Sequence, residues 1–186
     1  MPNPVAFQKE AAALEDFGVQ LEGRLIISRG AHLILPYHPL VERISEERKG
    51  VKKIGTTSLG IGPAYEDKAA RCGLRVGDLL ELEVFRERLW ANLQEKNALF
   101  RAAGLPALDG QAVYDEFAGH ASRLSRYIGD VSQLLSRKLR EGKSVLFEGA
   151  QGALLDIDHG TYPFVTSSNS TAGGVATGLG IGPTWI

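Results

Sequence analysis

Residues 144–152 read Ser-Val-Leu-Phe-Glu-Gly-Ala-Gln-Gly, and this stretch decides the predicted fold class. Its apolar run, ended by Gly149, predicts a short buried strand. Ligands of open α/β folds bind beyond the carboxyl ends of such strands, which is where Gln151 would lie. A glutamine side chain both donates and accepts hydrogen bonds, so it suits recognition of a base or carbonyl edge. The alternative is an ordinary glutamine in a surface turn.

The flanking sequence predicts helices around further short strands. A second strand is expected at residues 24–28, and a helical insertion at about residues 81–140 separates the two strands. The predicted helices span residues 4–17, 39–48, 64–71, 81–103 and 111–140, the last with a break near Gly129. This order predicts an α/β fold. We expect residues 1–186 to form a single partial domain.

Composition excludes several classes of protein. The chain has 186 residues, with 21 Lys and Arg against 22 Asp and Glu, so no general attraction to nucleic acid or acidic membranes is expected. The single cysteine, Cys72, excludes an intrachain disulfide framework and a multi-cysteine zinc site. No apolar run approaches the roughly 20 residues of a membrane-spanning helix, and residues 1–18 do not resemble a secretory signal. These features predict a cytoplasmic protein.

The carboxyl-terminal region is rich in glycine and poor in charge. Of 22 glycines, nine lie between residues 142 and 186, and no Asp, Glu, Lys or Arg follows residue 158. A flexible linker has a similar composition but rarely carries aromatic residues such as Tyr162, Phe164 and Trp185. We therefore expect this tail to pack against a ligand or against protein outside the chain.

A glycine-rich loop at residues 53–63, Lys-Ile-Gly-Thr-Thr-Ser-Leu-Gly-Ile-Gly-Pro, is a candidate anion site. Successive backbone N–H groups of such loops can converge on an anion. Gly55 and Gly60 have the spacing of a nucleotide phosphate loop, but Ile61-Gly62 follow where Lys-Ser/Thr is required. The loop is thus not that motif, and an ordinary structural turn remains the alternative.

Two cations follow the loop. Lys68 and Arg71 are three residues apart and share a helix face, so they favour an anion site beside the glycines. The alternative is a solvated helix face.

Other polar residues carry weaker signals. Asp156, Asp158 and His159 are expected to form local hydrogen bonds rather than a metal site, because adjacent side chains converge only in a special loop. His32 and His38 have no matching partners in the sequence and are expected to be structural. We predict no metal ligands in this chain.

Three blocks of sequence resemble the adenylosuccinate synthetase family. Residues 60–71 are similar to the family signature Gly-Ile-Gly-Pro-x-Tyr-x-x-Lys-x-x-Arg, and residues 147–169 and 171–178 match two further family blocks in the same order. The resemblance implies a partial P-loop-NTPase-like mixed sheet with a helical insertion. It also implies GTP-dependent ligation of IMP and L-aspartate, in which GTP phosphorylates the purine O6 and the aspartate amine displaces that phosphate.

The resemblance covers only part of the family's enzyme. The Gly-Asp-Glu-Gly-Lys-Gly-Lys phosphate loop is not found in this sequence. The residues that the family uses for Mg²⁺, for most GTP contacts, and as its general base and catalytic histidine belong to regions not matched here. We therefore expect an internal fragment that is inactive by itself. The alternative is a non-catalytic nucleotide-binding or dimerisation module derived from the family. A third interpretation, an unrelated anion-binding α/β protein, requires the motif matches to be accidental.

The resemblance assigns site residues by matching motif. Thr57 and Thr166 resemble the hydroxyls that hold the IMP phosphate, and Gln151 resembles the side chain that contacts the purine near its reacting oxygen. Arg71 resembles the arginine that reaches the IMP phosphate of the neighbouring subunit, which implies a homodimer. Lys68 is the lysine of the signature. Lys68 and Gln151 are thus the expected catalytic residues, and no nucleic acid or membrane partner is expected.

One position departs from the family pattern. The family usually has Gly-Arg where this chain has Ser58-Leu59. That arginine is associated with recognition of anionic substrates, notably aspartate, and leucine cannot supply a bidentate guanidinium. The departure implies either weakened use of aspartate or a compensating cation nearby. Cys72, where the family usually has arginine, is a milder change.

Overall fold

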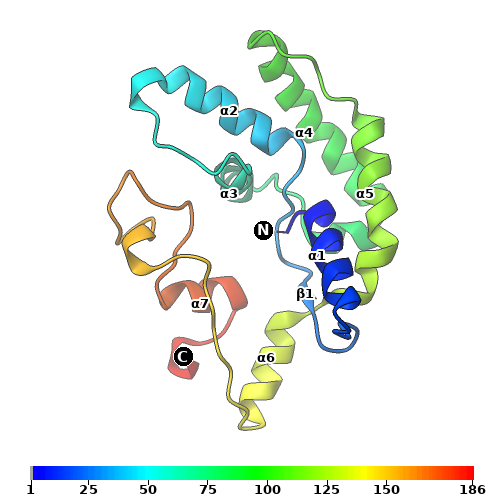
Figure 1. The fold of residues 1–186 in the computed structure, drawn as a ribbon, viewed down its shortest axis with the longest axis vertical. Helices are drawn as coiled ribbons and strands as arrows, with labels where there is room; N and C mark the ends of the chain where they lie inside the picture. Colours follow the sequence, from blue (N-terminus) through cyan, green and yellow to red (C-terminus); the bar gives the residue numbers. More distant parts are fainter. Residues whose placement is uncertain (1) are drawn as a thin grey trace. The chain divides into compact units, whose positions relative to one another are not determined.

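The computed structural model describes residues 2–186, and the chain divides into two units, residues 1–129 and 130–186. The structure is mostly helical with a small parallel sheet (Figure 1). The helices of the first unit are α1 (Pro4–Asp16), α2 (Tyr37–Lys49), α3 (Ile61–Ala70), α4 (Leu82–Ala102) and α5 (Gly110–Leu124). Short 3₁₀ turns cover Gly50–Lys52, Val76–Leu80 and Ser125–Tyr127.

Local sequence explains where these helices begin. The Asn3 side chain accepts hydrogen bonds from two N–H groups in the first turn of α1, and Asp109 does the same for α5. Helix α3 begins at Ile61, three residues before the predicted start. Pro63 does not prevent this, because an N–H in the first turn of a helix has no intrahelical partner to lose.

The sheet pairs two short strands in parallel. In β1 (Ile27–Ser28) and β2 (Ile128–Gly129), Ile27 pairs with Ile128 and Ser28 with Gly129. The expected strand at residues 24–28 is thus confirmed only at its end. The predicted break near Gly129 is confirmed, because β2 interrupts the helical region there. A Cβ atom at Gly129 would lie 2.9 Å from Cγ2 of Ile26, so the two chains approach closely at this point.

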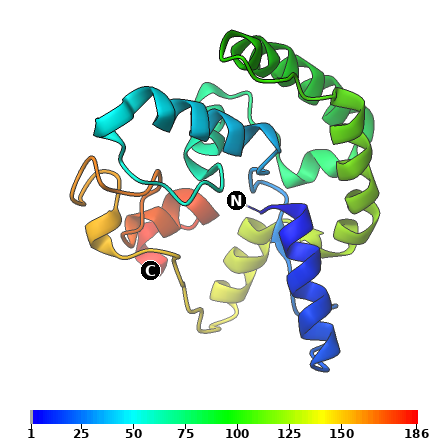
Figure 2. The ribbon, with the colours of Figure 1, turned by 45° about the horizontal axis from the view of Figure 1, so that its top comes forward.

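The core of the first unit lies between α4 and α5. Helix α4 confirms the helix predicted at residues 81–103, and it buries Phe85, Leu89, Leu93 and Phe100. The Phe85 ring stacks on Phe117 of α5 with centroids 5.8 Å apart. Helix α2 lies beside α3 (Figures 1 and 2), and the start of α2 reaches this core through the buried Tyr37.

The second unit has little regular structure. It contains α6 (Val131–Arg140), α7 (Gly173–Leu179) and 3₁₀ turns at Ala153–Leu155 and Pro183–Trp185. No residue of α6 is buried, so the apolar positions of this helix form no buried stripe. Helix α7 was not predicted, because its Gly- and Thr-rich sequence has low helix propensity.

The strand predicted at residues 144–148 is wrong. The structure assigns no strand there, and the Leu146 side chain is 90% exposed. A strand needs a neighbouring chain to accept and donate its ladder hydrogen bonds, and no segment among residues 2–186 pairs with this one. The expectation that Gln151 lies at the carboxyl edge of a sheet fails for the same reason.

No helix within residues 2–186 is both long and apolar enough to cross a lipid bilayer.

Candidate functional site

A cation-lined cavity of about 550 Å³ lies at the carboxyl end of α3. Backbone hydrogen bonds build its floor by joining residues 29–33 to residues 74–77, as in the 2.8 Å bond from the Leu33 N–H to the Leu74 carbonyl. Gly77 allows this close approach, since a Cβ there would lie 3.0 Å from the Arg29 carbonyl oxygen. The charged and titratable residues that line the cavity are Arg29, His32, Lys68, Arg71, Arg75, Asp78, Glu81 and Arg88.

Lys68 and Arg71, the two cations of the family signature, lie in this cavity without carboxylate partners among the described residues. Asp78 pairs with Arg88 at 3.2 Å and accepts the N–H of Arg75, so its charge is already engaged. In the part of the chain that the structure describes, Lys68 and Arg71 form no ion pair. The structure thus brings Lys68 and Arg71 together as predicted, and it leaves their charge available to an anion.

His32 adds an unpartnered group to the same cavity. Its side chain is only 8% exposed, and its Nδ1 has no hydrogen-bond partner among residues 2–186. Burial, together with the charges of Arg75 and Lys68, lowers the pKa of His32. A buried imidazole without a partner is costly, and an anion in the cavity would offer it an acceptor. No sequence pattern predicts this placement of His32, because it depends on pairing between distant segments.

Arg71 has a left-handed backbone, with φ of 66° at the residue that ends α3. This region costs a non-glycine residue about 1–2 kcal/mol. Such strain persists where the surrounding structure enforces it, and it concentrates at functional sites. The left-handed backbone therefore indicates a functional role for Arg71, independently of the charge of its side chain.

The glycine-rich loop is held by carboxylates of α2 rather than left open. The N–H of Gly60 donates to Glu42 at 2.8 Å, and the N–H of Gly55 donates to Glu46 at 3.3 Å. These N–H groups are not free to converge on an anion, so that expectation is wrong for both glycines. The exposed Thr57 lies between them but does not line the cavity. The Thr57 hydroxyl is thus the group of this loop that stays a candidate for contact with an anion.

In the second unit, a buried carboxylate organises the segment that carries Thr166. Asp156 is fully buried and accepts four backbone N–H groups at 2.7–3.1 Å, from Asp158, His159, Ser170 and Thr171. The bond from Thr171, followed by those from the other three, holds the pKa of the Asp156 carboxyl well below its usual range, against the opposing effect of burial. The expectation of local hydrogen bonding at Asp156 is confirmed. Among the described residues, no group of three or more His, Cys, Asp or Glu side chains is arranged to hold a metal ion.

The remaining predicted site residues are in the same unit. Thr166 is half-buried, its N–H donates to the Leu155 carbonyl at 2.9 Å, and its Oγ1 lies 3.5 Å from the Ser168 hydroxyl. Gln151 is exposed. The structure thus describes Thr57, Lys68 and Arg71 in the first unit, and Gln151 and Thr166 in the second.

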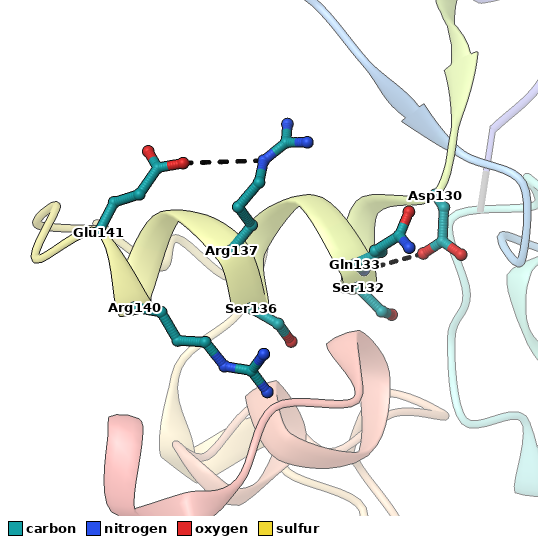
Figure 3. Close-up of a pocket in the computed structure, with 7 residues that line it drawn as sticks. All are labelled: Asp130, Ser132, Gln133, Ser136, Arg137, Arg140 and Glu141. Atoms are coloured by element: carbon teal, nitrogen blue, oxygen red, sulfur yellow. Dashed lines mark hydrogen bonds and ion pairs between the residues drawn. The ribbon is translucent and has the colours of Figure 1, made fainter.

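A larger cavity, about 700 Å³, lies along α6 and contains no motif residue. Figure 3 shows Ser132, Ser136 and Arg140 on one side of the helix and Arg137 and Glu141 on the other. Arg137 and Glu141 form an exposed ion pair at 3.8 Å, one turn apart. These are ordinary features of a solvated helix face, so this cavity is not the candidate site.

We expect Asp156→Asn to loosen the Thr166 segment. A depressed carboxyl pKa contributes stability above the unfolded pKa of about 3.9, and this contribution is lost as the pH falls below it. In the native chain, the Ser170 and Thr171 amides should therefore lose protection against exchange when the pH is lowered below about 4, after correction for intrinsic exchange. In Asp156→Asn it should already be low at pH 7. Amide hydrogen exchange measures this, with Glu148→Gln, which changes an exposed carboxylate outside this segment, as the control. Unchanged protection in Asp156→Asn would contradict the assignment.

Comparison with known proteins decides the family. The family model of adenylosuccinate synthetase matches residues 1–186, the whole chain. The chain belongs to the adenylosuccinate synthetase family. This result confirms the resemblance found in the signature blocks.

Individual relatives agree. The chain is 52% identical over 185 residues to "Adenylosuccinate synthetase" of Geobacillus sp. (strain WCH70), covering 99% of this chain and 43% of that relative. It is 51% identical over 185 residues to the protein of the same name from Heliobacterium modesticaldum, with the same coverage. The structure of fully ligated adenylosuccinate synthetase from Plasmodium falciparum matches with a TM-score of 0.88 at 36% identity, covering 99% of this chain and 42% of that one. The chain thus spans less than half the length of these synthetases.

Proposed function

We propose that this chain acts as part of an adenylosuccinate synthetase and supplies its IMP-binding and dimer-contact residues. The observation that carries the proposal is the cavity in which Lys68, Arg71 and the unpartnered His32 lie together, in a chain matched over its whole length by the family. A nucleoside monophosphate brings the anionic group that such a cavity fits.

The proposed chemistry divides the work between phosphate and purine. Thr57 and Thr166 donate hydroxyl hydrogens to the IMP phosphate, and Arg71 reaches the IMP phosphate of the partner subunit in a homodimer. Gln151 hydrogen-bonds the purine near O6, the oxygen that GTP phosphorylates and aspartate's amine then displaces. Lys68, one helical turn before Arg71, adds positive charge where phosphoryl charge must be offset.

Mg²⁺ and GTP belong to the reaction of the family, but the described residues do not fit the metal, since they offer no cluster of three ligating side chains. We assign no step to a metal in this chain. The proposed context is a P-loop-NTPase-like mixed sheet to which residues 1–186 contribute one partial domain, with the helical insertion at about 81–140. A cytoplasmic location is part of the same proposal.

A non-catalytic nucleotide-binding or dimerisation module is the second candidate. Leu59 favours it, because this side chain is 60% exposed in the loop beside Thr57, where the family usually has an arginine. An exposed leucine offers nothing to an anionic substrate. Kinetics with aspartate separate the two candidates, as argued below for Leu59→Arg.

We expect only a complete synthetase to form adenylosuccinate. In the complete protein used for this test, residues 1–186 replace the segment of the Geobacillus relative that they match. The complete protein should convert IMP, aspartate and GTP at a readily measured rate. The 186-residue chain alone should give none, because its sequence contains no phosphate loop for GTP. A coupled turnover assay on both proteins decides this. GTP-dependent turnover by the short chain, or none by the folded complete protein, would contradict the proposal.

A further inference from the structure

A buried polar cluster lies directly beneath the signature cations. Its centre is Asp67, the residue before Lys68 on α3, and its side chain is 4% exposed. Asp67 Oδ2 accepts a hydrogen bond from the Tyr37 hydroxyl at 2.8 Å and lies 3.0 Å from His38 Nε2. Asp67 Oδ1 lies 3.0 Å from Lys96 Nζ. One carboxylate therefore joins α3 to the start of α2 and to α4.

The hydrogen bonds settle the proton positions in this cluster. The Leu35 N–H donates to His38 Nδ1 at 2.8 Å, so Nδ1 is an acceptor and Nε2 carries the proton that points at Asp67. Burial alone would raise the pKa of Asp67, but hydrogen bonds from His38, Tyr37 and Lys96 outweigh it and hold this pKa well below its usual range. The carboxylate is thus charged, fully partnered and fixed in direction. The expectation that His38 is structural is confirmed, although no sequence pattern predicted its partners Leu35 and Asp67.

The same cluster holds the turn that follows α3. The Asp67 carbonyl oxygen accepts the N–H groups of Cys72 at 3.1 Å and Gly73 at 3.0 Å. The Asn92 amide donates to the Cys72 carbonyl at 2.9 Å and to the Tyr37 hydroxyl at 3.1 Å. The left-handed Arg71 lies between Asp67 and the Cys72–Gly73 segment, and hydrogen bonds hold both of these in place. The backbone carbonyl of Asp67 and the Asn92 amide therefore hold the turn directly, while the buried carboxylate fixes the residue that carries this carbonyl and binds the Tyr37 hydroxyl that Asn92 also contacts.

We infer that Asp67 is a positioning residue, which aims the Arg71 guanidinium at its anion by fixing the left-handed turn at the end of α3. The inference rests on the function proposed for Arg71. A buried ion pair is by itself weak evidence for stability, so the directional constraint on Arg71 is the property to test. Asp67 itself does not line the cavity.

The test is a double-mutant cycle in the complete synthetase. Asp67→Asn keeps the shape of the side chain but loses the charge and one acceptor. We expect it to raise the KM for IMP about tenfold and to leave kcat and the KM for GTP within about twofold, because misaiming a binding group costs affinity. In an Arg71→Leu background, Asp67→Asn should alter the KM for IMP less than about twofold. Asp67 acts by orienting the Arg71 side chain, and this side chain is absent from that background.

The controls separate positioning from folding. Glu66→Gln removes a carboxylate from the neighbouring, exposed position and should leave every constant unchanged. If Asp67→Asn does not fold, Tyr37→Phe, which removes only a hydroxyl, replaces it in the same cycle with an expected rise of about threefold.

The outcomes also separate this inference from the function proposed for Arg71. An Arg71→Leu variant with an unchanged KM for IMP would refute the proposed function. Suppose instead that Arg71→Leu raises the KM for IMP. If Asp67→Asn then has no effect on this KM, or has the same effect with and without Arg71→Leu, the inference about Asp67 is wrong and the function proposed for Arg71 stands.

Discussion

We expect a mixture of Arg71→Leu and Gln151→Ala subunits of the complete synthetase to regain about a quarter of the native activity, although each variant alone should be nearly inactive at limiting IMP. If Arg71 completes the partner's pocket, a mixed dimer has one pocket with both lesions and one with neither. Random exchange makes about half of the dimers mixed, and half of their pockets are intact. Neither variant should unfold, because both side chains are exposed.

Subunit exchange followed by an activity assay measures this recovery. Exchange is verified by recovering a differently tagged subunit with its partner, and each variant mixed with itself is the control. A proven exchange without a gain in activity would mean that Arg71 acts within its own chain. The shared pocket, and the need for a homodimer, would then be wrong.

Leu59→Arg is expected to lower the KM for aspartate about tenfold or more in the complete synthetase. A hydrogen bond to a charged group contributes roughly 1.5–3 kcal/mol, and Leu59 is exposed in the loop, so a longer side chain fits without repacking. The KM for GTP should change much less. Steady-state kinetics check this, and Leu59→Gln provides a polar control that lacks the guanidinium charge.

If neither anionic substrate responds to Leu59→Arg, the position is structural and its departure from the family has no bearing on aspartate. A low aspartate KM already present in the native protein would show that another cation compensates. Undetectable aspartate use that the arginine restores would favour the module over the ligase.

The positions of α4 and α5 were predictable because they depend on local sequence. The stripe of Phe85, Leu89, Leu93 and Phe100 repeats at helical spacing, and a matching face on α5 buries it. The strand at residues 144–148 was not predictable from the same kind of pattern. A strand depends on a partner elsewhere, and this apolar segment has none among residues 2–186.

The candidate site divides in the same way. Lys68 and Arg71 share a helix face three residues apart, so their common cavity could be predicted. Asp67 and His38 are 29 residues apart, and the bond between Gly60 and Glu42 joins residues 18 apart. Such pairs follow from the packing of α2 on α3, which no periodicity encodes. A weak signal existed in Glu42 and Glu46, which share one face of α2 next to an uncapped glycine loop.

The most direct measurement of the central proposal compares IMP with inosine, which lacks the phosphate, as ligands of the complete synthetase. Calorimetric titration, with competition for the weaker ligand, gives both dissociation constants. We predict that Arg71→Leu and Thr57→Val weaken IMP binding at least tenfold and leave inosine binding unchanged, because a bond to a charged phosphate is lost. Gln151→Ala should weaken both ligands alike. If Arg71→Leu and Thr57→Val weaken inosine as much as IMP, or leave IMP binding intact, these residues do not hold the phosphate and the proposed role of this chain is wrong.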